Sequence, residues 1–372
     1  MNILISGCYG TDNVGDEMIL QSLVEIANEK YGNTTMIASS IDPKRTEDLH
    51  SVNDAIPTIE RDPVQWVKTV RSVDMILLGG GSVIGGDFIY RHSVIIAIAK
   101  LMRIPVGYAA AGTTTMTKER LRVQCLQNVD FIMVRDSGSL DYVSSHVPSN
   151  KVSKVADPAY YNKYLNSAER TRSSEILICG KYIPQQHYDF DVDGLVNALD
   201  RVDECWEIKF LPCKYTTDRD FCLDVSERLD RRSKVIDKNL NHREFQERLS
   251  TAALVIGVRL HSIIMSIRAV TPVVGISYHP KCTNALLDLD ADTLHTVEDI
   301  NSEQLYTDID TKLKKGVTEH LKNYSREQSK SAATIYDKIE TQLRENKSER
   351  RVSRLHLETS IAVAEYLIGN RS

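Results

Sequence analysis

Residues 2–10 read NILISGCYG, a short apolar run that ends in glycines, and a helical pattern follows from about Asp16 to Lys30. The same alternation recurs through the first half of the chain. Further apolar runs occur at 35–39, 74–78, 105–109 and 131–134, with helical patterns between them. Short, continuously apolar strands separated by helices are typical of a parallel sheet that is covered by helices on both faces.

The pattern restarts after a polar stretch at 162–174. New strands are expected at 175–179, 207–211, 234–236, 254–257 and 272–276. The sequence therefore predicts an α/β protein with two doubly wound parallel-sheet domains that face a cleft. The expected boundaries are 1–165 for the N-terminal domain and 172–301 for the C-terminal domain. Residues 302–372 are expected to form a charged helical tail.

Composition excludes several classes of protein. With 26% charged and 42% hydrophobic residues in 372, the chain can bury a large core and is not disordered. A net charge of −5 provides no basic field for nucleic acid. The seven cysteines are odd in number and include no C-x-x-C pair, which favours reduced thiols in a cytoplasmic protein.

Membrane and metal binding receive little support from the sequence. The longest apolar stretch, 93–112, is interrupted by Lys100, Arg103 and Pro105 and cannot span a bilayer. Basic residues at 344–354 leave a peripheral contact with an anionic membrane open, although a solvated helix face explains their mixed charge better. No His/Asp/Glu cluster has the spacing of metal ligands, so no metal site is expected.

The first candidate site follows the first strand, where Gly10-Thr11-Asp12-Asn13-Val14-Gly15-Asp16-Glu17 leads into a helix. Its glycine spacing matches neither a dinucleotide fingerprint nor a P-loop. Carboxylates and an amide at such a turn suit hydrogen bonding to hydroxyls, or removal of a proton from one. Capping of the helix by Asp12 or Asp16 explains the same residues equally well.

Two further features lie in the first half. Gly79-Gly80-Gly81-Ser82 directly follows an apolar run, so its backbone N–H groups are predicted to face a ligand, although a tight packed turn is the alternative. Arg135 follows the run at 131–134 and is either ligand-facing or part of a turn.

The strongest feature is Gly257-Val258-Arg259-Leu260-His261-Ser262, between the apolar run at 254–257 and an apolar helix. This position is the carboxyl end of a strand, where open parallel sheets bind ligands. Arginine presents a planar fork to carboxylate or phosphate. Histidine exchanges a proton near neutral pH. Together they indicate a site for a small anion with acid–base chemistry.

These motifs, in this order, resemble those of the polysaccharide pyruvyl transferase family. The matching segments are Gly10–Glu17, Gly79–Gly81, Arg135–Ser139, Asp157–Ala159 and Arg259–Ser262. The resemblance covers roughly residues 1–290 and leaves the charged tail unmatched.

The resemblance implies a fold like the B-type glycosyltransferases. It also implies phosphoenolpyruvate as donor and co-substrate, without a further cofactor. The acceptor would be a sugar of a lipid-linked or nucleotide-linked surface-glycan precursor, and the product a pyruvate ketal. On this basis the expected roles are His261 and Asp16 in catalysis, Arg259, Ser262, Gly80 and Gly81 in donor binding, and Asp12, Asn13 and Arg135 in acceptor binding.

Two alternatives stay open. A nucleotide-sugar glycosyltransferase of the same architecture would need a base-reading, diphosphate-binding pocket, and no E-x-x-x-x-x-x-E signature is evident after His261. A non-catalytic member of the fold would release no phosphate with any acceptor.

Overall fold

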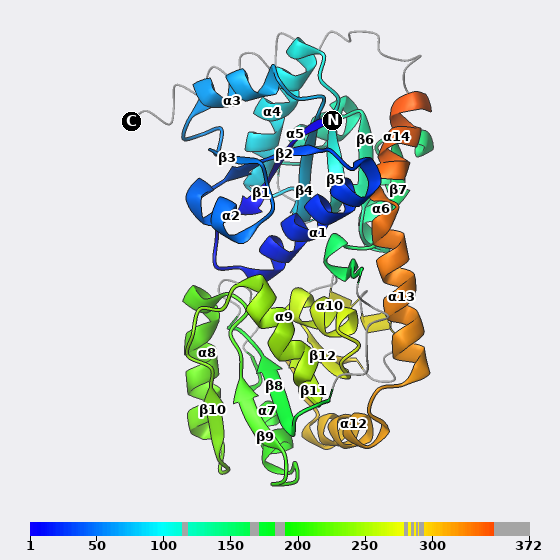
Figure 1. Ribbon diagram of the computed structural model, residues 1–372. Helices are drawn as coiled ribbons and strands as arrows, with labels where there is room; N and C mark the ends of the chain where they lie inside the picture. The colour runs from blue at the N-terminus through cyan, green and yellow to red at the C-terminus, as the bar shows by residue number, and fades with distance from the viewer. Residues whose placement is uncertain are drawn as a thin grey trace. The chain divides into compact units, whose positions relative to one another are not determined.

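The computed structural model describes residues 1–113, 118–163, 171–182, 190–278, 282–283, 286–287, 289 and 294–345. The chain divides into two compact units. Of the described residues, unit 1 comprises 1–11, those of 19–158 and 331–345, and unit 2 comprises 12–18 and those of 159–330. Each unit is built around its own sheet (Figure 1).

The sheet of unit 1 is parallel throughout, with the strand order β3-β2-β1-β4-β5-β6-β7. Its strands are β1 (Asn2–Tyr9), β2 (Thr35–Ser40), β3 (Asp54–Pro57), β4 (Met75–Ile84), β5 (Val106–Thr113), β6 (Phe131–Val134) and β7 (Val152–Lys154). Leu4 and Ile76 belong to the core under one face, and their neighbours Ile5 and Leu77 are equally buried on the other. Burial of both faces explains why these strands are apolar without alternation.

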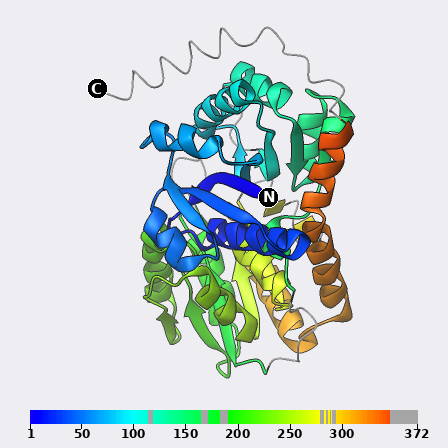
Figure 2. The same ribbon diagram turned by 45° about the horizontal axis from the view of Figure 1, so that its top comes forward.

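Helices cover this sheet. They are α1 (Val14–Tyr31), α2 (Pro43–Leu49), α3 (Pro63–Val70), α4 (Phe88–Met102), α5 (Glu119–Asn128), α6 (Ser137–Ser144) and α14 (Ile335–Glu345). The helix α14 runs beside β6 in both views (Figures 1 and 2). Its Tyr336 hydroxyl donates to the Leu23 carbonyl oxygen, and the Gln342 side-chain oxygen accepts from the Ile132 N–H.

The sheet of unit 2 is also parallel, in the order β10-β9-β8-β11-β12-β13. Its strands are β8 (Glu175–Cys179), β9 (Glu207–Phe210), β10 (Ser233–Val235), β11 (Leu254–Gly257), β12 (Val273–Ser277) and β13 (His295–Thr296). The described helices include α7 (Val192–Asp200), α8 (Tyr215–Arg228), α9 (His242–Thr251), α10 (Leu260–Arg268), α12 (Ser302–Lys315) and α13 (Glu319–Ala333). The prediction of two doubly wound parallel sheets is confirmed.

Several details differ from the sequence expectation. The glycines at 79–81 were expected in a loop, but β4 continues through them to Ile84, with a register shift against β5 after Gly81. The strands β3, β7 and β13 were not expected, because they have four residues or fewer and carry polar residues or proline. The segment beyond 302 is shared: α12 lies in unit 2 and α14 in unit 1. The basic stretch at 344–354 lies almost wholly outside the described residues.

No helix among the described residues is long and apolar enough to cross a membrane.

Candidate functional site

An arginine–aspartate pair organises the end of β11. Arg259, the N-cap of α10, donates from Nε to Asp218 Oδ2 at 2.5 Å and from Nη2 to Asp218 Oδ1. Asp218 lies in the first turn of α8 and is fully buried. It also accepts from the backbone N–H of Lys214 at 2.9 Å and from the Thr217 hydroxyl at 3.0 Å. Asp218 therefore fixes both the start of α8 and the direction of the arginine fork.

The pairing leaves part of Arg259 available. Burial would lower the pKa of its guanidinium, but the hydrogen bonds and charge of Asp218 outweigh this and raise it, so the group stays cationic. Nη2 also donates to the Thr217 hydroxyl at 3.0 Å. Nη1 has no hydrogen bond within the part of the chain that the structure describes, and the side chain keeps 17% of its surface exposed. One edge of the fork can thus receive an anion.

His261 follows two residues later, in the first turn of α10, and is half-buried. Its imidazole lies against the backbone of Gly15: a Cβ built at Gly15 would be 2.1 Å from His261 Nδ1. The glycine is required here because any side chain would displace the ring. The structure therefore brings the glycine-containing segment 10–17 and the segment 257–262 together, at Gly15 and His261.

Two of the three predicted acceptor residues, Asp12 and Asn13, belong to the same unit as His261. Asp12 accepts from the Thr216 N–H at 2.7 Å, at the start of α8, and a bridge joins Asn13 to Lys214. Burial raises the pKa of Asp12, but the hydrogen bonds from Thr216 lower it more, so its carboxylate is ionised. Asp12 was weighed as a cap of the helix that follows it; it caps α8 instead.

Asn13 is the residue that caps α1, because its side-chain oxygen accepts from the Gly15 N–H at 3.3 Å. Its amide nitrogen donates to Asp16 Oδ2 at 2.5 Å. Asp16 is partly exposed in the first turn of α1. It follows Gly15 directly, so a second carboxylate lies one residue from the backbone that contacts His261.

Ser262 was predicted to bind the donor, but it is buried, and its hydroxyl donates to the Arg259 carbonyl oxygen at 2.6 Å. This bond closes the turn between β11 and α10. Ser262 therefore supports the backbone of Arg259 and has no exposed surface with which to contact a ligand.

Gly80, Gly81 and Arg135 lie in unit 1. Arg135 donates to Asp157 at 2.7 Å and to the Ser82 hydroxyl at 2.8 Å, and both charged side chains are at most 4% exposed. The acceptor-binding role expected for Arg135 therefore has no exposed guanidinium to carry it. The ion pair instead joins the ends of β4 and β6 to the segment after β7.

Packing accounts for the glycines of β4. Gly80 has φ +74°, and a Cβ there would be 2.1 Å from Ile19 Cγ2. A Cβ at Gly79 would be 2.7 Å from the Ala109 carbonyl oxygen. The alternative of a close-packed backbone explains Gly79 and Gly80 without a ligand. Gly81 also has a positive φ, of 81°.

Asp218 is the functional residue that sequence reasoning missed. It lies in the first turn of α8, where an acidic side chain is common, so its residue type does not single it out. Its partner is 41 positions away in the sequence, so no local pattern marks it.

Among the described residues no group of three or more His, Cys, Asp or Glu could hold a metal ion.

Two parallel sheets with covering helices, and an arginine at the carboxyl end of a strand in the second, are the features of a two-domain α/β protein with the fold of the B-type glycosyltransferases. The model of the family "Polysaccharide pyruvyl transferase" matches residues 13–280, most of the chain. The chain belongs to this family and is a transferase enzyme. No curated protein sequence matches it.

Solved structures with the same fold include sugar-modifying enzymes at low identity. UDP-GlcNAc 2-epimerase from Neisseria meningitidis, bound to UDP-GlcNAc, has 11% identity and a TM-score of 0.58, with coverage of 91% of this chain and 99% of that one. The UDP-GlcNAc 2-epimerase from Methanocaldococcus jannaschii has 14% identity, a TM-score of 0.57 and the same coverage. ADP-heptose LPS heptosyltransferase II from E. coli has 13% identity and a TM-score of 0.51, over 85% and 99%. These likenesses establish the fold alone.

Proposed function

We propose that this enzyme transfers the pyruvyl group of phosphoenolpyruvate to two hydroxyls of one sugar in a surface-glycan precursor, forming a pyruvate ketal. Family membership supports pyruvylation of a polysaccharide or its precursor. The observation that carries the donor assignment is the open edge of Arg259: a cationic fork, fixed by Asp218, that keeps Nη1 for a ligand. Phosphoenolpyruvate offers it a carboxylate and a phosphate.

The atoms of the reaction balance without an oxidant or reductant. A proton is added to the enol CH₂ carbon, which becomes a methyl group. The bond between C2 and the phosphate oxygen breaks, and phosphate leaves. Two sugar hydroxyls form C–O bonds to C2, and each gives up its proton. One of these two protons balances the new methyl group and the other the departing phosphate.

The side chains are assigned to these steps by type and position. His261 is the general acid, since imidazole exchanges protons near neutral pH and this one is half-buried beside Arg259 in the same turn. Arg259 holds the donor and stabilises the negative charge that develops on the leaving phosphate. Asp16 is the base for an acceptor hydroxyl, and Asn13, bonded to it, orients that hydroxyl.

The test is phosphate release from phosphoenolpyruvate across a panel of activated sugars, with mass spectrometry of the acceptor for added pyruvate. H261A and R259A are expected to lower the rate by at least about 100-fold, as loss of a general acid or of a charge-stabilising donor does. R232A, an exposed arginine of the same unit, is the matched control and should retain activity. Thermal melts exclude unfolded variants.

Near-wild-type transfer by both H261A and R259A would show that the site is assigned wrongly. Titration with uridine and guanosine diphosphates distinguishes the glycosyltransferase alternative. If a diphosphate raises the melting temperature and phosphoenolpyruvate does not, the chain uses a nucleotide-sugar and the proposed donor is excluded.

A further inference from the structure

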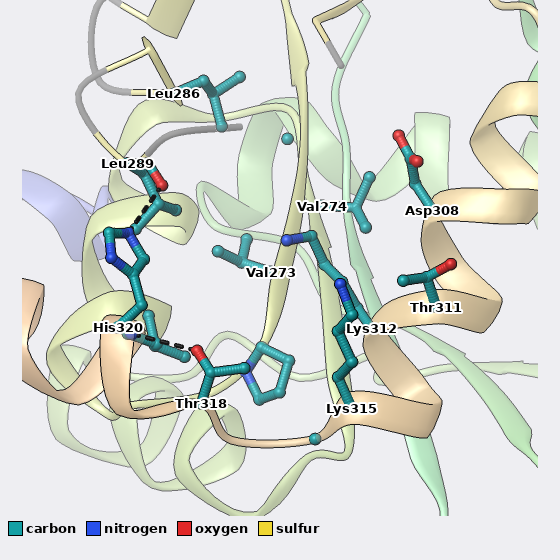
Figure 3. Close-up of a pocket in the computed structure, with 14 residues that line it drawn as sticks. Val273, Val274, Leu286, Leu289, Asp308, Thr311, Lys312, Lys315, Thr318 and His320 are labelled. Carbon is teal, nitrogen blue, oxygen red and sulfur yellow. Dashed lines mark hydrogen bonds between the residues drawn. The ribbon is translucent and has the colours of Figure 1, made fainter. Parts of the chain in front are cut away.

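A cavity in unit 2 is not used by the proposed reaction. It encloses about 310 Å³ beside the residues that begin β12, whereas the candidate site follows the end of β11 (Figure 3). Val273, Leu289 and Leu321 supply apolar surface, and Lys312, Lys315 and His320 supply polar surface. None of these residues belongs to the candidate site, so the cavity needs its own explanation.

The volume limits what the cavity can hold. Ligand pockets in proteins span roughly 300 to 1,000 Å³, so this one is at the lower end. A small organic molecule fits this space.

Two lysines give the cavity its charge. Lys312 and Lys315 are three residues apart in the last turn of α12 and therefore lie on the same face of the helix. Both extend toward Val273 in Figure 3. Neither forms an ion pair with any residue that the structure describes. The lining residue Asp308 forms no ion pair with either lysine: its Oδ2 lies 2.9 Å from His295 Nε2, and its Oδ1 accepts from the Gln304 side-chain amide at 3.1 Å.

The position of these lysines has a second explanation. Cations at the C-terminal end of a helix stabilise it through the helix dipole, without any ligand. Lys314 occupies the same turn, but it pairs with Asp310 at 2.6 Å and does not line the cavity. Lys314 therefore shares the dipole role and lacks the cavity role, which makes it the matched control.

We propose that this cavity binds a small organic phosphate monoester. Two ammonium groups match the charge of such a phosphate, about −1.5 to −2 near pH 7, and lysine binds phosphate as a point charge. The organic part lies against Val273, Leu289 and Leu321. The site does not depend on the proposed transfer reaction.

Calorimetric titration of the full chain with phenyl phosphate tests the proposal. Wild type and K314Q are expected to bind it equally, and the double variant K312Q/K315Q at least about tenfold more weakly, because two direct charge contacts are lost. Inorganic phosphate should bind more weakly than phenyl phosphate, since it has no apolar part. Phenol should not bind, since it has no dianionic group.

Three outcomes would overturn the proposal. Wild-type affinity in K312Q/K315Q would contradict it, and so would a loss of affinity in K314Q as large as that in the double variant. Binding that is lost in R259A but kept in K312Q/K315Q would belong to the candidate site instead. Melting curves without ligand confirm that the variants fold, so weaker binding reports on the cavity.

Discussion

Two buried arginine–aspartate pairs lie at the carboxyl ends of strands, one in each unit. Arg135 and Asp157 in unit 1 are 4% and 3% exposed, and Nη1 and Nη2 of the arginine both have protein partners. Arg259 and Asp218 in unit 2 are 17% and 0% exposed, and Nη1 of Arg259 keeps no partner among the described residues. The Arg135–Asp157 pair is therefore closed, with no exposed guanidinium edge, and the Arg259–Asp218 pair is open, with one guanidinium edge exposed.

The difference shows how a buried carboxylate can serve either stability or binding. An arginine whose guanidinium is buried against protein partners contributes only to the fold. An arginine that is fixed along one edge keeps a rigid, cationic second edge, which binds an anion with little loss of side-chain freedom. Changes at the two pairs test this distinction directly, and changes at His92 and Gly15 test one further buried contact in each unit.

Removing the carboxylate charge of the closed pair should have the largest effect. D157N leaves the Arg135 charge buried without compensation, which costs about 3–5 kcal/mol of unfolding free energy. Urea denaturation measures it. The control is D141N, at an exposed position of α6 that has no ion pair among the described residues, and it should cost under about 1 kcal/mol. Equal losses in the two variants would contradict the closed-pair assignment.

Replacing the arginine of the open pair should affect activity. R259K keeps the charge but lacks the planar fork, so it cannot bind Asp218 side-on and present a second edge. The expected loss in kcat/KM for phosphoenolpyruvate is about 100-fold. R135K is the matched variant and should stay within about threefold, once its stability is taken into account. A larger loss in R135K than in R259K would reverse the comparison.

The stability contributed by the buried histidine of α4, His92, should depend on pH. Burial, with a smaller contribution from the Arg91 charge, lowers the pKa of His92 to about 3. The unfolded state binds its proton near pH 6.5, so the stabilisation from neutral His92 is complete above that pH and is lost as pH falls toward 3. Relative to H92L, the wild type should lose about 2 kcal/mol of unfolding free energy between pH 7 and pH 5. Parallel curves for the two proteins would show that His92 is not buried in this way.

The contact between Gly15 and His261 should give the smallest effect. A methyl group at position 15 would displace the imidazole, whose Nδ1 would be 2.1 Å from the new Cβ. G15A is therefore expected to lower kcat about tenfold, with a smaller change in KM. G32A is the control, because nothing lies within 4 Å of a Cβ there, although its positive φ costs some stability. Unchanged kcat in G15A would mean that His261 does not need its present orientation.

The sequence predicted what depends on local pattern. Apolar runs identified the long strands, and the segment at 257–262 was placed correctly at the end of a strand. Local pattern could not predict the role of Asp218 or the capping of α8 by Asp12, because each depends on a partner tens or hundreds of positions away. The glycines of β4 were read as a loop because close packing against Ile19 has no signature in the sequence.

The segment 12–18 makes its contacts with unit 2, although the residues on both sides of it belong to unit 1. A fragment restricted to 159–330 would carry Arg259 and His261 but would lack Gly15 and the carboxylate that caps α8. Neither half of this gene, expressed by itself, would encode a complete site. Recombination that exchanged only one half of the gene between relatives would combine His261 of one protein with the segment 12–18 of another. The two segments are therefore expected to be inherited together.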